Sequence, residues 1–415
     1  MSVNIGVAPK IIITIAGGEN IGEHIVAFEW KSFINGGYII RAKVHDAYLR
    51  IVRTLTKENN FLKDARRGPT EVKWKMKWAD RPDSEYTLER TAFISDIDIY
   101  GSANYGGFDF VAVDPPSWWL NAGNGNGKVY EGKVSDVIKQ VVREYSSGIT
   151  ISVSETKDHP KGAWCMMRQD PKTFIQSLLD WSCSLTNNRT NWLVASVDNK
   201  LFIKEQYDLL SSSQLLANYH GSFMTNKNDI VDFNLISNVF MTTIQSKLTT
   251  QGISAVSGKY FDKETDKPHS EVTDENTNKK INTSIDQSLG YKKPSSDWST
   301  SIMSIPEFNG GELGLKYDDY IDGRARNLYL SMLPMVMRCM ITVPGDFRYH
   351  DSSKLGASRV SISWDDSDGE QFFLSGRWLI YGFHHRMARG NGDDTSWFTD
   401  LYLYRIDYDA SAVKV

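Results

Sequence analysis

The stretch 375-SGRWLIYGFHHRMARG-390 decides how the chain is interpreted, because it holds two adjacent histidines within an alternating apolar pattern. Such a pattern is typical of a strand, in which neighbouring side chains point to opposite faces of a sheet. One face would carry Leu379, Tyr381, Phe383, His385 and Met387, and the other Trp378, Ile380, Gly382, His384 and Arg386. His384 and His385 would then face apart and could not readily bind one metal ion. We interpret them as structural or interface histidines.

Motifs for other kinds of active or metal site are missing from the sequence. The chain has no HExxH, CxxC or GxSxG motif, and its three cysteines, Cys165, Cys183 and Cys339, are widely spaced. Such spacing argues against a structural zinc site or a disulfide framework and fits a reducing compartment. The carboxylate pair of a glycoside hydrolase has no sequence motif, because its members need only approach in space. We therefore predict no catalytic, cofactor-binding or metal-binding residue and no cofactor.

Three further segments have both a functional and a structural interpretation. The glycine-rich segment 16–22 lies between two predicted strands and lacks a following Lys-Ser/Thr, so a turn is favoured over a phosphate loop. Lys73, Lys75 and Lys77 could contact nucleic acid, but three lysines without arginine favour the solvated face of a sheet. The acidic segment 364–370 lacks the spacing of an EF-hand, so a polar turn is favoured over a calcium loop.

Length and composition describe a globular chain of two to four domains. The chain has 415 residues, of which 40% are hydrophobic, 24% charged and 12% aromatic, with a formal net charge of −4. This charge gives no indication of nucleic-acid binding. The aromatic content fits β-rich packing or broad interfaces. The amino terminus does not resemble a signal peptide, and no apolar run approaches the roughly 20 residues of a membrane helix, so we expect folding in a cytoplasm.

Residues 1–113 read as a β domain. Residues 71–78, EVKWKMKW, alternate strictly, which predicts a strand with Val72, Trp74, Met76 and Trp78 on its buried face. Residues 90–101 and 108–113 predict a hairpin that turns between residues 102 and 107. Three further strands are predicted, at residues 10–15, 25–30 and 38–44.

Residues 117–207 read as a small α+β domain. Residues 134–145 have helical spacing, with Ser135 as a candidate cap, and Asp170 with Pro171 begins a second helix. A hairpin that turns at Asp198-Asn199 follows. The chain then returns to strands at 208–245, passes through a polar insertion or long loop at 246–309, and closes with a helix near 319–332 and further strands. The second β domain would combine residues 208–245 and 310–410.

This order of segments resembles the central hub protein of phage tail baseplates and related contractile injection machines. The resemblance covers most of the chain. Its most specific pieces are 170-DPKTFIQSLLDWSCSLT-186 with Trp181 and the following hairpin, the closing hairpin at 375–405, and the segment SDIDIYG…GFDFVAVDPP at 95–116. The fold class that follows is α+β and mostly β, with two tube-type β-barrel domains, a small α+β domain and a polar excursion.

The resemblance implies a structural protein of the virion rather than an enzyme. Hubs of this family are homotrimers in which two similar tube domains per chain form a pseudo-hexameric ring. That ring adapts the sixfold tail tube to the threefold spike and lines the DNA conduit. The implied partners are other copies of the chain, the tail spike, tail tube or tube-initiator proteins, the tape measure protein and other baseplate proteins, without specific nucleic-acid binding. Assembly would take place in the host cytoplasm. Two alternatives stay open, namely a cell-wall glycoside hydrolase and a host-surface binding protein of the tail tip.

Overall fold

The computed structural model describes most of residues 9–237 and 337–405, and a few short pieces between these two parts. The described residues are 9–58, 68–78, 88–102, 105–123, 125–157, 163–180, 182, 184–185, 192–205, 215–222, 228–237, 258–259, 261–262, 267–268, 303–304, 337–365, 375–389 and 395–405. The predicted helix near 319–332, the acidic residues 366–370, Cys183, Trp181 and nearly all of the predicted insertion lie outside these residues.

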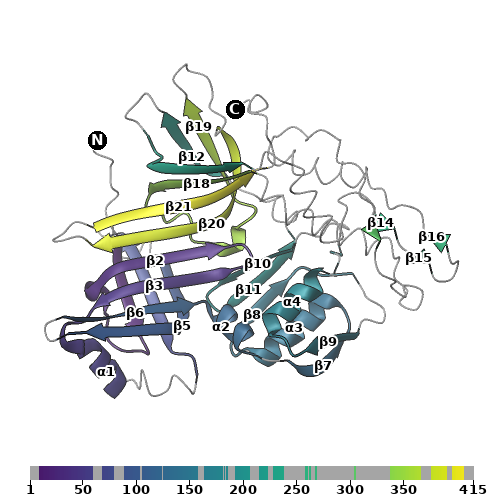
Figure 1. The fold of residues 1–415 in the computed structure, drawn as a ribbon, viewed down its shortest axis with the longest axis horizontal. Coiled ribbons are helices and arrows are strands. Elements are labelled where there is room, and N and C mark those ends of the chain that lie inside the picture. The colour runs from purple at the N-terminus through teal and green to yellow at the C-terminus, as the bar shows by residue number, and fades with distance from the viewer. Residues whose placement is uncertain are drawn as a thin grey trace.

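A large sheet forms the body of the molecule and draws strands from both ends of the chain (Figure 1). The amino-terminal strands are β1 (Pro9–Ile15), β2 (Ile25–Phe33), β3 (Gly37–His45), β4 (Glu71–Trp78), β5 (Leu88–Gly101) and β6 (Gly106–Val113). The others are β12 (Leu215–Ser222), β13 (Asp232–Ser237), β18 (Met337–Pro344), β19 (Arg359–Asp365), β20 (Gly376–Arg389) and β21 (Thr395–Arg405). Strand and helix contents confirm the α+β, mostly β class.

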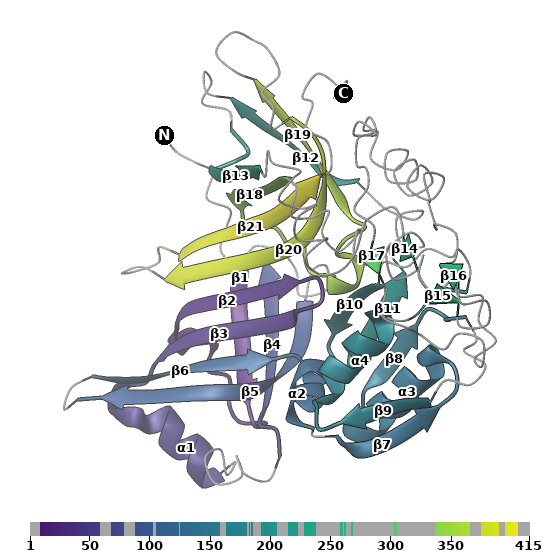
Figure 2. The ribbon, with the colours of Figure 1, turned by 45° about the vertical axis from the view of Figure 1, so that its right-hand side comes forward.

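The two groups of strands have the same order in space. The amino-terminal set runs β1-β4-β5-β6-β3-β2, and the second set runs β12-β19-β20-β21-β18-β13. Numbered along the chain within each set, both orders are 1-4-5-6-3-2. The sets differ in the first pair, since β1 and β4 are antiparallel while β12 and β19 are parallel. β2 and β20 join the sets as neighbours in one sheet (Figure 2). Closure of either set into a barrel, and domain boundaries at the predicted positions, stay predictions.

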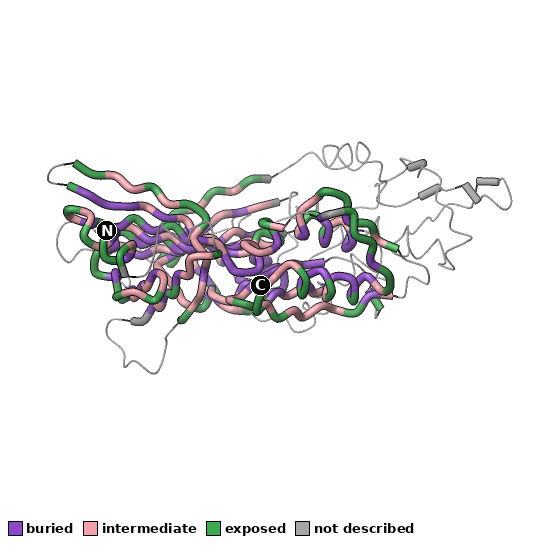
Figure 3. Tube along the Cα trace, turned by 90° about the horizontal axis from the view of Figure 1, so that it is seen from below, coloured by how far each residue is buried: buried purple, intermediate pink, exposed green. Residues whose placement is uncertain are grey.

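One buried cluster lies behind both sets of strands. It includes the residues that alternate along β4, with Trp74 fully buried and Lys73 and Lys75 on the other side. The amphipathic helix α1 (Arg50–Glu58), which follows the short helix η2 (Ala47–Leu49), adds Val52 and Leu55 to this cluster. Buried and less buried residues alternate along β1 and β3. Figure 3 shows buried and exposed stretches interspersed along the trace. In β4, which has no bulge, the alternation of the sequence correctly predicts which face is buried.

The α+β unit has a buried cluster of its own. It contains the helices α2 (Pro115–Ala122), α3 (Val134–Tyr145) and α4 (Pro171–Asp180). Its strands are β7 (Asn126–Glu131), β8 (Thr150–Val153), β9 (Ala163–Met167), β10 (Trp192–Val197) and β11 (Lys200–Glu205). The carboxylate of Asp170 accepts from the N–H of Thr173 at 2.8 Å, which confirms the predicted cap of α4.

The predicted cap of α3 is wrong. Helix α3 begins at Val134 with Lys133 in the N-cap position, and no side chain caps it there. The N–H of Ser135 donates instead to Oγ1 of Thr156, at 3.0 Å, from the segment that follows β8. A tertiary contact thus supplies what a local cap would have supplied. None of the described helices is long and apolar enough to cross a membrane.

Candidate functional site: the seam between the two strand sets

The seam is built on β20, whose two halves have different neighbours on the same edge. The first half pairs with β19, through contacts such as Leu379 opposite Arg359. The second half pairs with β2, from Gly382 opposite Phe33 to Ala388 opposite Ala27. β21 pairs along the other edge of both halves. A single long strand therefore belongs to the second set and also binds the first.

A bulge at Tyr381 separates the two halves of β20. Opposite β21, Ile380 faces Leu403 and Gly382 faces Tyr402, so Tyr381 is the extra residue. Gly382 beside it has no room for a side chain, because a Cβ there would lie 2.3 Å from Cδ1 of Phe33. The bulge and the glycine thus let β2 approach β20 closely where the pairing changes.

The bulge also corrects the predicted faces of this strand. Cross-strand partners put Ile380 on the core side with Phe383 and His385, since they lie opposite the alternating residues Leu403, Leu401 and Thr399. Ile380 and Trp378 were predicted on the other face, and Leu379 and Tyr381 with His385. The prediction was wrong for the first half of the strand, because a bulge shifts the alternation by one residue. The opposite orientation of the two histidines is confirmed.

His385 is buried at the seam and holds three segments together. Its Nε2 lies 2.7 Å from the carbonyl oxygen of Tyr349, and its Nδ1 lies 2.9 Å from Oγ1 of Thr399. The carbonyl can only accept, so Nε2 carries the proton and Nδ1 accepts from the Thr399 hydroxyl. Burial lowers the pKa of His385 to about 4, which keeps the ring neutral. Its ring stacks on Trp30 with centroids 5.0 Å apart.

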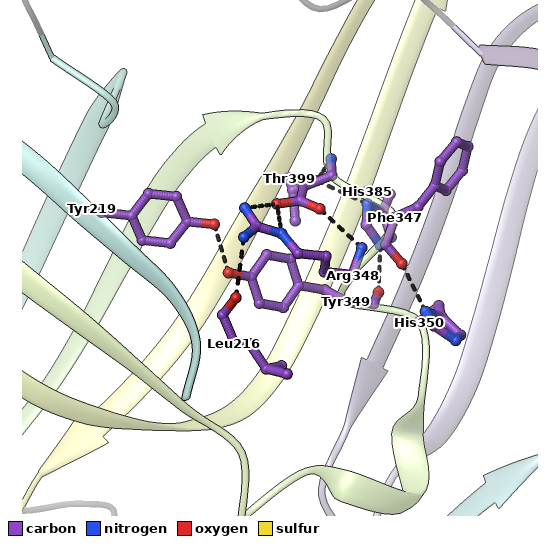
Figure 4. A network of polar contacts seen from close by, with 9 residues as sticks. Leu216, Tyr219, Phe347, Arg348, Tyr349, His350, His385 and Thr399 are labelled. Atoms are coloured by element: carbon purple, nitrogen blue, oxygen red, sulfur yellow. Dashed lines mark hydrogen bonds and ion pairs between the residues drawn. The ribbon is translucent and has the colours of Figure 1, made fainter. Parts of the chain in front are cut away.

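The polar contacts around His385 extend to β12 (Figure 4). Thr399 also accepts from the N–H of Asp346 at 3.1 Å, and Nε of Arg348 donates to Asp346 at 2.7 Å. Nη1 of Arg348 donates to the carbonyl of Leu216 at 3.0 Å. The hydroxyls of Tyr219 and Tyr349 lie 2.5 Å apart. These contacts tie the loop after β18 to β12, β20 and β21, which is a structural role.

His384 lies on the opposite, open face of the sheet among charged residues. Its Nε2 is 3.4 Å from Glu29 and its Nδ1 is 3.6 Å from Asp400. Asp400 accepts from Thr342 and from Arg386, each at 2.8 Å. Burial lowers the pKa of His384, although both carboxylates act in the other direction. The seam therefore carries mixed charges on its open side and a neutral, packed histidine on its core side.

Mixed charge also describes the rest of the open face. Glu29 lies opposite Arg41 on β3 and Arg386 on β20, and Lys43 lies opposite Asp109 on β6. On β4, Lys73 pairs with Glu71 of the same strand, and Lys75 pairs with Glu89 of the neighbouring strand β5. Two lysines of the stripe, Lys73 and Lys75, are therefore paired with carboxylates on the strand surface. The absence of specific nucleic-acid binding stays a prediction.

The α+β unit is attached to the sheet at the turn before β3. The N–H of Asn35 donates to the carbonyl of Val194, and the N–H of Val194 donates to Oδ1 of Asn35, both at 2.9 Å. Asp114, which is fully buried, caps α2 at Ser117 and also accepts from the N–H of Tyr38. Burial raises the pKa of Asp114. Asp114 lines a small pocket with Leu120, among others, but its carboxylate is already used by these structural bonds.

The glycine-rich segment 16–22 protects the outer edge of β1. Oδ1 of Asn20 accepts from the N–H of Ile13 and of Gly22, and the N–H of Ile21 donates to the carbonyl of Ile13. The turn interpretation is thus confirmed, with a function that sequence did not indicate. Among the described residues, no group of three or more His, Cys, Asp or Glu side chains could hold a metal ion.

Comparison with solved structures addresses the fold. A tail protein from Neisseria meningitidis aligns over 96% of this chain and 97% of its own, with a TM-score of 0.57 and 10% identity. The 43 kDa tail protein of prophage MuSo2 from Shewanella oneidensis aligns over 96% and 98%, with a TM-score of 0.53 and 10% identity. The fold is that of phage tail proteins. This confirms the resemblance to tail hub proteins at the level of the fold.

A further structural similarity is to a chain of a VgrG-containing complex. A chain of a PdpA–VgrG complex in its lidless form aligns over 97% of this chain and 66% of its own, with a TM-score of 0.53 and 12% identity. No protein-family model matches the sequence. No curated protein is significantly similar to it in sequence.

Proposed function

We propose that the chain is the structural hub of a phage tail baseplate. The observation that carries this proposal is the repeated strand order, 1-4-5-6-3-2, in one chain. Three copies of a chain with two similar sets present six similar units around a threefold axis. Such a ring matches a sixfold tail tube on one side and a threefold spike on the other, and its opening is a conduit for DNA.

The proposal includes the domains and partners that the sequence suggests. Residues 1–113 form the first tube domain, residues 208–245 and 310–410 the second, 117–207 the decorating α+β domain, and 246–309 the insertion. The partners are the spike, the tube or tube-initiator proteins, the tape measure protein and other baseplate proteins, in the virion. The mixed charges on the open face of β2, β3 and β20 support a conduit wall that lets DNA pass without holding it.

A structural role without catalysis also agrees with the chemistry of the seam. His385 is neutral and bonded through both ring nitrogens, so it has no free nitrogen for proton transfer. Asp400 and Asp114 are each bonded to several donors. We expect no hydrolysis of peptidoglycan by the purified chain.

Native mass and negative-stain images of the same sample test the proposal. We expect a mass three times that of the 47.0 kDa chain and a threefold ring with a central opening. A monomer at micromolar concentration that also fails to form a ring with its tail spike would overturn the proposal. Peptidoglycan hydrolysis that one carboxylate substitution abolishes would favour the glycoside hydrolase instead.

A further inference from the structure

The outer edges of the two strand sets are protected by their own loops. On β1, Asn20 and Ile21 occupy the edge at Ile13. On β12, which has the corresponding place in the second set, the N–H of His220 donates to Asp229 at 2.9 Å and that of Ser222 to Asn228 at 2.7 Å. Loops that occupy edges in this way prevent pairing with another chain. The contrast with two other edges in the molecule is informative.

Those two edges lie on β5 and β13, far apart in the fold (Figure 2). β4 pairs with β5 only as far as Phe93, so among the described strands residues 96–101 have β6 as their one neighbour. β13 has β18 as its one neighbour among those strands. In the repeated order, β5 corresponds to β20 and β13 corresponds to β2. Their counterparts β2 and β20 pair with each other at the seam.

We propose that β13 of one copy pairs antiparallel with residues 96–101 of β5 in a second copy, repeating between chains the pairing of β2 with β20. This inference rests on the proposed function, because it identifies the interface that would join the chains of the ring. The interface joins different surfaces of the two copies, so it repeats around a closed ring rather than ending in a twofold dimer.

The repeat also gives the register of the proposed pairing. β5 has a bulge at Ser95 opposite β6, as β20 has at Tyr381 opposite β21. Aligning the two bulges makes Ile97 equivalent to Phe383 and Ile99 equivalent to His385. Following the cross-strand partners through β3 and β18 makes Phe233 equivalent to Phe28 and Leu235 equivalent to Trp30. The register of β2 on β20 then sets three pairs opposite each other, namely Leu235 with Ile99, Ile236 with Asp98, and Asn234 with Tyr100.

Burial agrees with this register on both strands. Phe383, His385, Phe28 and Trp30, which meet at the seam, are almost fully buried. Their counterparts Ile97, Ile99, Phe233 and Leu235 are only partly buried in a single chain. Ile236 is 46% exposed on the edge strand. Pairing would place Leu235 against Ile99 and complete the burial of these apolar side chains.

A cysteine pair tests the register directly. In a Cys165→Ser background, which removes an exposed thiol, Ile236→Cys is combined with Asp98→Cys. Residues directly opposite in antiparallel strands have Cα atoms about 4.5–5.5 Å apart, within reach of a disulfide. We expect covalent species up to the trimer, and none larger, on mild oxidation. The matched control combines Ile236→Cys with Asp109→Cys, because Asp109 lies opposite Asp98 and so one strand, about 4.8 Å, farther away.

Mixing the two single variants shows whether the bond forms between copies. A sample of Ile236→Cys chains and Asp98→Cys chains should give a dimer that contains one of each. A trimeric native mass without cross-links above the control would overturn the pairing but leave the proposed ring intact. Monomers without cross-links, both in the purified chain and after addition of the tail spike, would overturn both.

A charge exchange gives a second measurement that does not depend on oxidation. Ile236→Glu would place a carboxylate opposite Asp98. Association of the chains, measured by native mass, should then be weaker at least several-fold. Adding Asp98→Lys to this variant should restore association. Equal weakening in the single and double variants would contradict the register, because a nonspecific loss of apolar area would not be reversed by the opposite charge.

Discussion

His385 stacks on Trp30 with their ring centroids 5.0 Å apart, although the two residues belong to opposite ends of the chain. Trp30 also packs edge-on against Trp74 and Phe383. The aromatic side chains of β2, β4 and β20 thus meet at one point behind the seam. This aromatic contact packs the amino-terminal strand set against the carboxy-terminal set. Substitutions in it should therefore lower the stability of both sets.

Trp30→Ala should reduce the free energy of unfolding by about 3–5 kcal/mol, the usual range for removal of a fully buried large aromatic side chain. Because Trp30 contacts both strand sets, its loss should also uncouple them, so that the two sets unfold in separate transitions. Denaturant unfolding followed by tryptophan fluorescence and by far-UV circular dichroism measures both effects. Val26→Ala, at an exposed position of the same strand, is the control and should change stability little. Equal effects of the two substitutions would contradict the packing.

The folded protein should lose stability as pH falls from about 6.5 to 4 through His385. In this interval the unfolded chain binds a proton at His385, whose ordinary pKa is 6.5, while the folded chain, with a pKa of about 4, does not. The unfolded state is therefore favoured by about 3 kcal/mol across the interval. Comparing unfolding of the wild type with His385→Gln at pH 7.5 and 4.5 measures this difference. The variant should have a shallower dependence on pH, and an unchanged dependence would count against a buried neutral histidine.

Gly382→Ala should loosen the pairing of β2 with β20. The added methyl group would lie 2.3 Å from Cδ1 of Phe33, so Phe33 or the strand must move, at a cost of about 1–3 kcal/mol. Hydrogen exchange of the amides in β2 and thermal unfolding measure the change. Gly68→Ala is the matched control, since a Cβ there meets nothing within 4 Å. Faster exchange in β2 with Gly382→Ala alone is the expected result.

Asp114→Ala should release the α+β unit from the sheet. The carboxylate caps α2 at Ser117 and accepts from the N–H of Tyr38 on β3, both of which would lose a buried partner. We expect a loss of about 1–3 kcal/mol, with increased hydrogen exchange at residues 35–38 and 194–196. Asp136→Ala, at an exposed carboxylate of α3, should leave both quantities unchanged. Protection that persists in Asp114→Ala would show that other contacts hold the unit.

Local patterns in the sequence predicted the elements and their buried faces where no tertiary contact intervenes. The alternation around Trp74 and the cap at Asp170 are correct because each depends on residues a few positions away. The cap proposed at Ser135 is wrong because the helix begins at Val134, so Ser135 lies inside the first turn, where its N–H donates to Thr156 of another segment. The faces around Ile380 fail because the bulge at Tyr381 is set by the pairing with β21.

The sequence by itself determined a mostly β chain with an inserted α+β unit and two histidines that face apart, because alternation, helical spacing and caps are short-range properties. Only the tertiary structure decided the repeated strand order, the pairing of β2 with β20, and the edges of β5 and β13 that differ from the protected edges of β1 and β12. The physical reason is that strands pair through backbone hydrogen bonds. These bonds form with almost any side chains, so the sequence of one strand says little about which distant strand pairs with it.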